Sequence, residues 1–475
     1  MKKYYSILVI LTLAITSGCK KEYASPVITA PQATSVEIAK TVDLSFSFNA
    51  EGGYSSLAVT ANGGAALIKT DGTEGATSGI IVVSFTAGTT VGAGAVTLTL
   101  TDSESQSGTV TAVVNIEGVP AISVTENIDV NTTWEQGNIY ILEGRITVLP
   151  GVTLTIQPGT IIKGREGSES NATALMISRG ARLMAEGTAE SPIIFTSVSD
   201  NIIPGEIESP NLDPTLNGLW GGLLILGKAP ISAEAEAMQI EGIPTSDLNG
   251  LYGGTDPADN SGIIKYVSIR HGGANIGEGN EINGLTLGGV GSGTIIENIE
   301  IVANQDDGIE WFGGTVNVKN VIVWNAGDDA IDTDQSWGGT LDNFIIVNPG
   351  DECLELDGPE GVMVAKHILK NGSLYAGDAQ GLVDLDPNSN VDMDGIYFFG
   401  LKAGQKFDEL PTLYTCTFAS LEATLPAGTS VVDFFKDGSD AFTTAVEPGS
   451  NTVGADVSSF QEWSWSAVSG SLSGF

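Results

Sequence analysis

The chain has 475 residues, and its 58 acidic and 20 basic side chains give a formal net charge of −38. Nucleic-acid binding requires clustered lysine and arginine, so this charge excludes nucleic acid as a partner and favours cations. The 61 glycines, the few aromatic residues and the many short runs of valine, isoleucine and threonine indicate an all-β chain.

The first element is an export signal. Lys2 and Lys3 precede an apolar run over residues 4–15, and small residues lead to Cys19, as in a secretory signal whose cysteine is lipidated. The run is shorter than the roughly 20 residues that a membrane-spanning helix needs. We expect a signal peptide over 1–18 and a lipidated linker over 19–27, so that only the lipid anchors the chain in the membrane. The alternative is an ordinary signal peptide with a chance cysteine.

The polar segment Lys20-Lys21-Glu22 follows that cysteine. It resembles the start of surface lipoproteins of Bacteroidota, in which charged residues after the lipidated cysteine direct export. The resemblance implies an outer-membrane lipoprotein that faces the cell surface.

Residues 28–118 alternate between apolar and polar side chains, most clearly from Val42 to Phe48 and from Ala95 to Leu100. Clusters of glycine, asparagine and aspartate separate these runs. The pattern predicts a small Ig-like β-sandwich. No catalytic constellation is visible in it, so we interpret this domain as a spacer, with a sugar-binding module as the alternative.

From residue 119 the pattern changes to short apolar triplets between glycine-rich corners. The segments Gly308-Ile309-Glu310, Ala330-Ile331-Asp332 and Cys353-Leu354-Glu355 recur at intervals of 22 and 23 residues. This period predicts a right-handed parallel β-helix over 119–440. We expect the tail over 441–475 to cap the C-terminal coils or fold back on them, because an open solenoid end exposes its core.

Acidic residues recur in each of these coils. Since Ile309, Ile331 and Leu354 face the core, the residues that follow them point outward, and stacking brings like residues about 5 Å apart. Two carboxylates at that separation repel by roughly 3 kcal/mol at an effective dielectric constant near 20. The predicted metal ligands are Asp306, Asp307, Glu310, Asp328, Asp329, Asp332, Asp334, Asp351, Glu352, Glu355 and Asp357.

Oxygen-only ligands favour Ca²⁺ over zinc or copper. The first-choice ligands are Asp332, Asp334, Glu355 and Asp357, and the paired acids at the preceding corner form a second set. The alternative is a solvated acidic ridge that holds no specific ion.

Several longer motifs carry a family resemblance. The runs over 218–227, 266–273, 278–285 and 306–314 resemble a family of Bacteroidota β-helix surface lipoproteins, over roughly residues 120–400. The resemblance implies a pectin-lyase-like fold and no established activity.

The leading functional hypothesis is a non-enzymatic, calcium-stabilised β-helix that binds a glycan or an envelope protein, as an adhesin or nutrient-capture accessory. One alternative is a calcium-dependent lyase on acidic polysaccharide, with Arg270, Lys366 or Lys370 as the base. Another is a structural subunit of an envelope assembly. The aromatic residues Trp311, Phe312 and Trp337 either stack on sugar or pack in the coils.

The pairs Asp306-Asp307 and Asp328-Asp329 look like the paired acids of polygalacturonase-type hydrolases. The Gly-His-Gly and Arg-Ile-Lys elements of those enzymes are missing from the sequence. Hydrolysis is therefore the weaker enzymatic interpretation.

Overall fold

The computed structural model describes residues 21–168, 172–275, 282–407 and 409–475. The chain divides into two compact units, one up to Val119 and one from Pro120 onward. The predicted signal peptide and Cys19 lie outside the described residues. Within the described ranges, no helix combines the length and the apolar character that crossing a membrane requires.

The first unit consists of two four-stranded sheets whose strands are buried on alternate residues. Phe46, Phe85 and Leu98 are among the side chains that the two sheets bury. One sheet contains, in order, β1 (Val27–Thr29), β3 (Thr41–Asn49), β6 (Ser78–Ala87) and β5 (Gly64–Thr70). The other contains β2 (Thr34–Glu37), β8 (Ser107–Glu117), β7 (Gly92–Asp102) and β4 (Tyr54–Asn62). The Ig-like topology of this unit stays a prediction.

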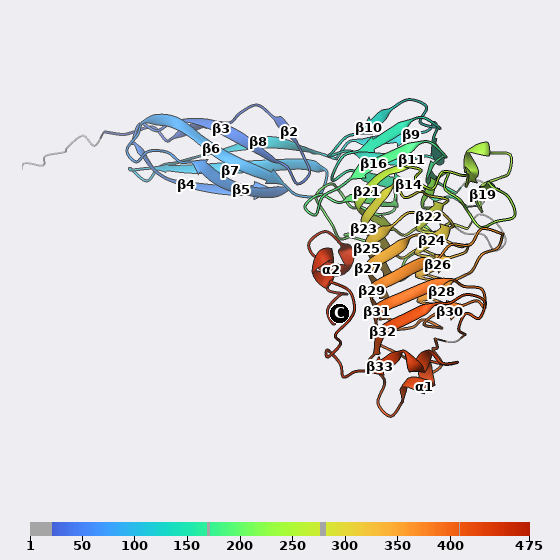
Figure 1. Ribbon diagram of the computed structural model, residues 1–475. Helices are drawn as coiled ribbons and strands as arrows, with labels where there is room; N and C mark the ends of the chain where they lie inside the picture. The colour runs from blue at the N-terminus through green and yellow to red at the C-terminus, as the bar shows by residue number, and fades with distance from the viewer. Residues whose placement is uncertain (1–20, 169–171, 276–281, 408) are drawn as a thin grey trace, which may run out of the picture. The chain divides into compact units, whose positions relative to one another are not determined.

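The second unit is a solenoid in which parallel strands of successive coils stack on one another (Figure 1). The longer sheet begins with the short strands β9 (Ala121–Val124), β11 (Ile139–Leu142), β14 (Ile161–Gly164) and β17 (Ile193–Ser197), beside β10 (Thr132–Trp134), β13 (Thr153–Ile156) and β16 (Arg182–Glu186). It continues with β21 (Gly262–Arg270), β23 (Ile295–Val302), β25 (Val318–Trp324), β27 (Thr340–Val347), β29 (His367–Tyr375), β31 (Val391–Phe399), β32 (Thr417–Ala423) and β33 (Thr443–Ala445). The sequence pattern placed the end of the solenoid at residue 440, whereas the last strand, β33, extends to Ala445.

The shorter sheet carries the candidate site. Its eight strands, all paired in parallel, are β12 (Arg145–Val148), β15 (Ala174–Ile177), β18 (Leu223–Leu226), β22 (Leu285–Gly288), β24 (Ile309–Phe312), β26 (Ile331–Thr333), β28 (Leu354–Leu356) and β30 (Asp384–Leu385). Their inward side chains join those of the longer sheet in one continuous apolar core. The predicted all-β class and right-handed parallel β-helix are confirmed.

The long strands of the longer sheet bend once per coil. Asn298, Asn320, Asn343 and Asn371 occupy the bend in four successive coils, with φ values of 59°, 56°, 63° and 59°. Asparagine tolerates this left-handed conformation better than most residues. The amide of Asn343 also donates to Asn320 Oδ1 at 2.7 Å, so the bends of successive coils are joined by side-chain hydrogen bonds.

Two segments cover the outer faces of the coils. Residues 227–261 leave the solenoid between β18 and β21 and include β19 (Met238–Gln239), a 3₁₀ turn (Leu248–Gly250) and β20 (Leu251–Tyr252). We call this segment the cover; it packs against the outer face of the shorter sheet through Ile240, Ile243 and Tyr252.

The C-terminal tail covers part of the longer sheet. It follows α1 (Val431–Phe434) and the 3₁₀ turn Ser439–Ala441, and includes the 3₁₀ turn Val457–Phe460 and α2 (Trp465–Val468). Phe460, Trp463 and Trp465 pack on outward side chains of the long strands, among them Ile322 and Ile345. The tail therefore folds back on the side of the coils, where α2 lies next to the long strands (Figure 1).

Candidate metal centre

One column of outward-facing acids runs along the shorter sheet. Glu310 is the register partner of Asp332, Asp332 of Glu355, and Glu355 of Asp384. Adjacent strands lie about 4.8 Å apart, so four carboxylates follow one another along the solenoid axis. The predicted alignment of Glu310, Asp332 and Glu355 is confirmed, and their role as ligands stays a prediction.

The first two acids of this column, Glu310 and Asp332, are buried, although they face away from the core. Glu310 is 6% exposed and Asp332 is 8% exposed. The cover reaches this region, because Gln335 Nε2 donates to the hydroxyl of Tyr252 at 3.0 Å. A solvated ridge is therefore wrong for Glu310 and Asp332, whereas Asp384 at the end of the column is exposed.

A second column lies at the corner that precedes these strands. Asp307 Oδ1 accepts the backbone N–H of Asp329 at 3.0 Å, and Asp329 Oδ1 accepts that of Glu352 at 2.6 Å. Each carboxylate thus binds the corner of the next coil with one of its oxygens. These bonds give Asp307 and Asp329 a structural role whether or not an ion is present.

Two tight groups of carboxylates form here, and the first of them joins the two columns. The oxygens of Asp307, Glu310 and Asp332 lie within 4.8 Å of one another, and those of Asp306, Asp307 and Asp328 do the same. The first group is entirely buried and combines one corner acid with two strand acids. Of the first-choice ligands Asp332, Asp334, Glu355 and Asp357, only Asp332 belongs to the buried group, and the role of all four as ligands stays a prediction.

Burial is the main cause of the raised pKa values of the carboxyl groups in this region. It raises the pKa of Asp307, Glu310 and Asp332 well above the ordinary carboxyl value, and neighbouring carboxylates raise it further. The effect extends along both columns: burial raises the pKa of Asp329 to about 11 and that of Glu352 to about 8. If Asp307, Glu310 and Asp332 are all ionised, a bound cation has to compensate their charge. Without a cation, protonation of the carboxylates has to do so.

Farther along the strands, Asp334 and Asp357 are half-buried. Burial raises the pKa of Asp334 to about 6, and Glu360 and Glu355 add to the shift. Burial and the charge of Asp386 raise the pKa of Asp357 to about 7. Asp334 and Asp357 therefore belong to the wider acidic surface, beside the buried group.

In the longer sheet, an outward column of charged residues contains both acids and bases. One of its outward columns reads Lys265, Glu297, Lys319, Asp342, Lys370 and Asp394 by strand register. Opposite charges alternate there, and Lys265 pairs with Glu297 at 2.9 Å. The acid column of the shorter sheet has no such compensation from lysine or arginine in its register.

Asn283 joins the buried group and was missed by the sequence analysis. Its Nδ2 donates to Glu310 Oε2, and its side chain is 1% exposed. Asn283 precedes Gly284 and Leu285 as Asp307 precedes Gly308 and Ile309. Because Thr286 is the register partner of Glu310, Asn283 occupies the corner position of Asp307 in the preceding coil. That shared pattern was the signal available in the sequence.

The donor set fits a hard divalent cation. Asp307, Glu310 and Asp332 offer carboxylate oxygens, and rotation of the Asn283 amide would add a fourth oxygen ligand, as Ca²⁺ prefers. Asp332 Oδ1 and Asn283 Oδ1 are buried without a hydrogen-bond partner among the described residues. Such unpartnered oxygens are costly unless an ion or water binds them.

The same spacing argues against hydrolysis by the inverting mechanism. Inverting glycosidases hold their two carboxyl groups about 6.5–9.5 Å apart, which leaves room for the attacking water. Oxygens of Asp306 and Asp328 approach to within 4.8 Å. The separation suits a shared ion or proton better than an intervening water.

The three basic residues considered for a lyase are engaged away from the acid column. Arg270 is fully buried and lies 3.6 Å from Glu300, so it is wrong as an accessible base. Lys366 donates to Asp392 at 2.8 Å, and Lys370 pairs with Asp342 at 3.4 Å.

The aromatic residues beside the column pack within the protein. Trp311 and Trp337 stack inside the coils with ring centroids 4.8 Å apart, and both are almost fully buried. Phe312 packs under the cover. The interpretation of these residues as coil packing is confirmed, and an exposed sugar-stacking platform is wrong.

A match to a known family supports the architecture. The family model described as pectate-lyase-like β-helix domain matches residues 125–371. A solved structure of a family 28 exopolygalacturonase from Yersinia enterocolitica shares 11% identity, covering 89% of this chain and 90% of the other, with a TM-score of 0.18. No curated protein matches the chain. The family match spans more than half of the sequence, so the chain belongs to the pectate-lyase-like β-helix domain family.

Proposed function

We propose that this protein is a lipid-anchored protein of the cell envelope whose β-helix binds a glycan and is stabilised by calcium. The observation that carries the calcium part is the buried group of Asp307, Glu310 and Asp332, whose oxygens lie within 4.8 Å of one another. A divalent cation offsets the repulsion among three ionised carboxylates without requiring any of them to be protonated.

The predicted export signal and the predicted lipidation of Cys19 support the envelope location. Family membership supports a glycan as the ligand, because the family is described by its likeness to pectate lyases. A long rigid body with glycan-binding faces suits an adhesin or a nutrient-capture accessory, facing the cell surface from the outer membrane. An envelope protein as ligand, or a role as an assembly subunit, would instead give a stable complex on pull-down from membranes.

Calcium binding is tested on the chain from Lys20 to Phe475 after removal of metal by a chelator. Isothermal titration should give saturable Ca²⁺ binding, and Ca²⁺ at about 100 times its Kd should stabilise the fold by about 2.7 kcal/mol. Asp332→Asn should weaken the binding, while Asp342→Asn, on the alternating column, should leave it unchanged. Equal Ca²⁺ affinity of both variants would contradict the assignment.

Glycan binding is tested on an array of acidic and neutral polysaccharides, with Ca²⁺ and with chelator. Binding should require Ca²⁺ and should not be accompanied by cleavage. Release of unsaturated products, followed by their ultraviolet absorbance, would instead support the alternative of a calcium-dependent polysaccharide lyase. Shortening of the chains without unsaturation would indicate hydrolysis.

A further inference from the structure

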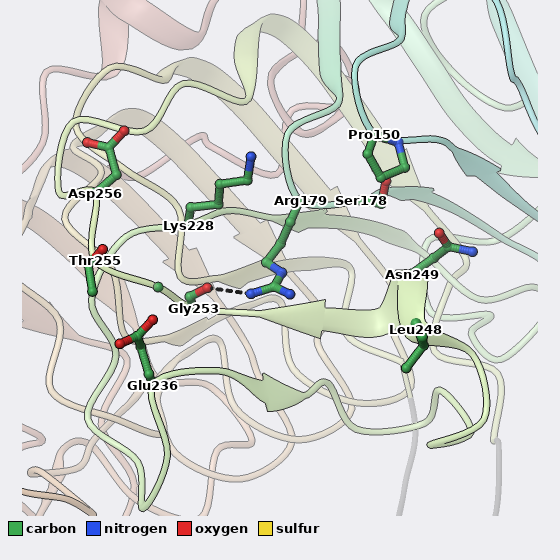
Figure 2. Close-up of a pocket in the computed structure, with 11 residues that line it drawn as sticks. Pro150, Ser178, Arg179, Lys228, Glu236, Leu248, Asn249, Gly253, Thr255 and Asp256 are labelled. Carbon is green, nitrogen blue, oxygen red and sulfur yellow. Dashed lines mark hydrogen bonds between the residues drawn. The ribbon is translucent and has the colours of Figure 1, made fainter.

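Two of the cavities of the solenoid contain basic residues. One, of about 390 Å³, lies beside the cover and contains Arg179 and Lys228 (Figure 2). The carboxylates of Glu236 and Asp256 line the same cavity and balance these two charges. The other is a groove of about 480 Å³ on the outer face of the longer sheet. Part of the charge in this groove has no partner within the chain.

The groove follows two outward columns of the longer sheet, on the part of the long strands that precedes their bend. One is the alternating column, which runs from Lys265 to Asp394. The other lies two residues earlier on each strand, and we call it the mixed column. It contains, in coil order, Ile263, Ile295, Asn317, Thr340, Ile368 and Asp392. The C-terminal tail packs on the part of the strands after the bend, at Ile322 and Ile345, and leaves the groove open.

The alternating column is electrically balanced, unlike the whole chain. It has three lysines and three acids, whereas the sequence has 20 basic residues against 58 acidic ones. Two of these lysines pair with neighbouring acids of the column, at 2.9 Å and 3.4 Å. For Lys319 and Asp394, both exposed, the described part of the chain provides no ion pair. These two charges are therefore available to a partner.

The order of the charges makes the alternating column complementary to itself. A two-fold axis parallel to the strands, between two copies of the chain, would set the column of one copy against that of the other in reverse order. The first residue then faces the last, and every pair joins opposite charges. The pairs between copies are Lys265 with Asp394, Glu297 with Lys370, and Lys319 with Asp342, each formed twice. Parallel solenoids would instead set like charges against each other.

The mixed column fits the same operation. Ile295 and Ile368 are large apolar side chains that are 39% and 37% exposed. They occupy the second and the fifth place of the column, so the reversal of order sets Ile295 against Ile368 of the second copy. Asn317 meets Thr340 in the same way. One symmetry operation thus pairs opposite charges in one column and apolar side chains in the other.

We propose that this face of the longer sheet binds a second copy of the chain, with the two solenoid axes antiparallel. The six residues of the alternating column span about 24 Å along the axis. The face is therefore smaller than the roughly 800 Å² per partner of a standard stable interface. We expect a weak dimer, with a Kd on the order of 100 µM. The inference does not depend on calcium or glycan binding.

The test uses the chain from Lys20 to Phe475 with Ca²⁺ and about 0.15 M NaCl, where a Debye length of about 8 Å screens the remote like charges of the two copies. Sedimentation at concentrations up to about 1 mM should show a monomer–dimer equilibrium. Lys319→Glu alone, and Asp342→Lys alone, should each weaken association at least about tenfold, because two like-charge contacts replace two ion pairs.

An equimolar mixture of these two variants should associate again. The introduced carboxylate of one then meets the introduced ammonium of the other, and the unchanged Lys319 and Asp342 meet as well. Zero-length carbodiimide cross-linking of the unchanged protein should join Lys265 to Asp394. These two residues lie about 24 Å apart along one chain, so this link forms only between copies.

Lys402→Glu is the matched control, because it changes the net charge equally and lies outside both columns. It should dimerise like the unchanged protein, and thermal melts establish that every variant folds. An unchanged protein that stays monomeric at about 1 mM would overturn the inference. So would a mixture that associates no better than Lys319→Glu or Asp342→Lys alone, or a dimer that neither substitution weakens.

Discussion

Glu310 and Asp332 are direct register partners on adjacent parallel strands, and both side chains are more than nine-tenths buried. Two like charges in this relationship destabilise the sheet unless something neutralises them. Burial raises the pKa of the Glu310 carboxyl group and also that of the Asp332 carboxyl group. The pair is therefore the most sensitive place at which to test how the protein compensates its acids.

The variant Asp332→Asn should have opposite effects with and without calcium. In chelator, the neutral amide removes the cost of burying an acid, and the free energy of unfolding should rise by about 1–3 kcal/mol. In Ca²⁺, the variant lacks a ligand and should be the less stable of the two proteins. Thermal melts in both buffers measure the difference. Destabilisation of the same size in both would show that Asp332 acts through packing alone.

The metal-free protein should lose stability as the pH rises. Burial raises the pKa of Asp334 to about 6 and of Asp357 to about 7, whereas the unfolded chain releases these protons near the ordinary value of 3.8. The folded state thus binds more protons than the unfolded state between about pH 4 and 7, and stability falls across that window.

Calcium should flatten this dependence, because it binds the ionised carboxylates. Thermal melts of the chelator-treated protein at about pH 5 and pH 8 give the change of stability with pH in the absence of metal. The same melts in Ca²⁺ give this change for the calcium-bound protein. A metal-free protein that is more stable at the higher pH would contradict the raised pKa values.

Removal of the Glu300 carboxylate should release the C-terminal tail. Glu300 accepts the backbone N–H of Trp465 at 3.1 Å and that of Ser466 at 2.8 Å, and it lies 3.6 Å from buried Arg270. Glu300→Ala leaves the guanidinium of Arg270 buried and uncompensated, which costs about 3–5 kcal/mol. Hydrogen exchange over residues 455–475 should accelerate strongly.

Glu297→Ala is the control, because the ion pair of Glu297 with Lys265 is partly exposed. Such a pair contributes about 0–1 kcal/mol, so exchange in the tail should stay slow. Fast exchange in both variants would mean that the tail is held by something other than Glu300.

The bend at Asn343 should depend on both backbone conformation and the amide. Asn343 has φ 63°, and its Oδ1 accepts the N–H of Asp456 at 2.7 Å. Asn343→Ala loses both features and should cost about 2–4 kcal/mol, whereas Asn343→Gly keeps the conformation and should cost about 1–2 kcal/mol. Urea unfolding measures both. Equal losses would assign the whole effect to the amide.

The coil repeat was predictable because it depends on the spacing of residues that are close in the sequence. The spacing of Ile309, Ile331 and Leu354 determines which residues share a face, so the alignment of Glu310 with Asp332 followed directly. Burial of that face was not predictable, because the cover over 227–261 lies far upstream and has no periodic pattern. Arg270 was misjudged for the same reason: its surroundings include Trp465, which is far away in the sequence and only 5.0 Å away in the fold.

The alternating column of the longer sheet constrains how this solenoid can lengthen. Lys265, Glu297 and Lys319 come from successive coils, so the sign of the charge reverses at every step. Insertion of a single duplicated coil would put two like charges side by side, whereas duplication of two coils together would preserve the order. The alternation of charge therefore repeats every two coils, and lengthening of this part of the solenoid by duplication should add coils in pairs.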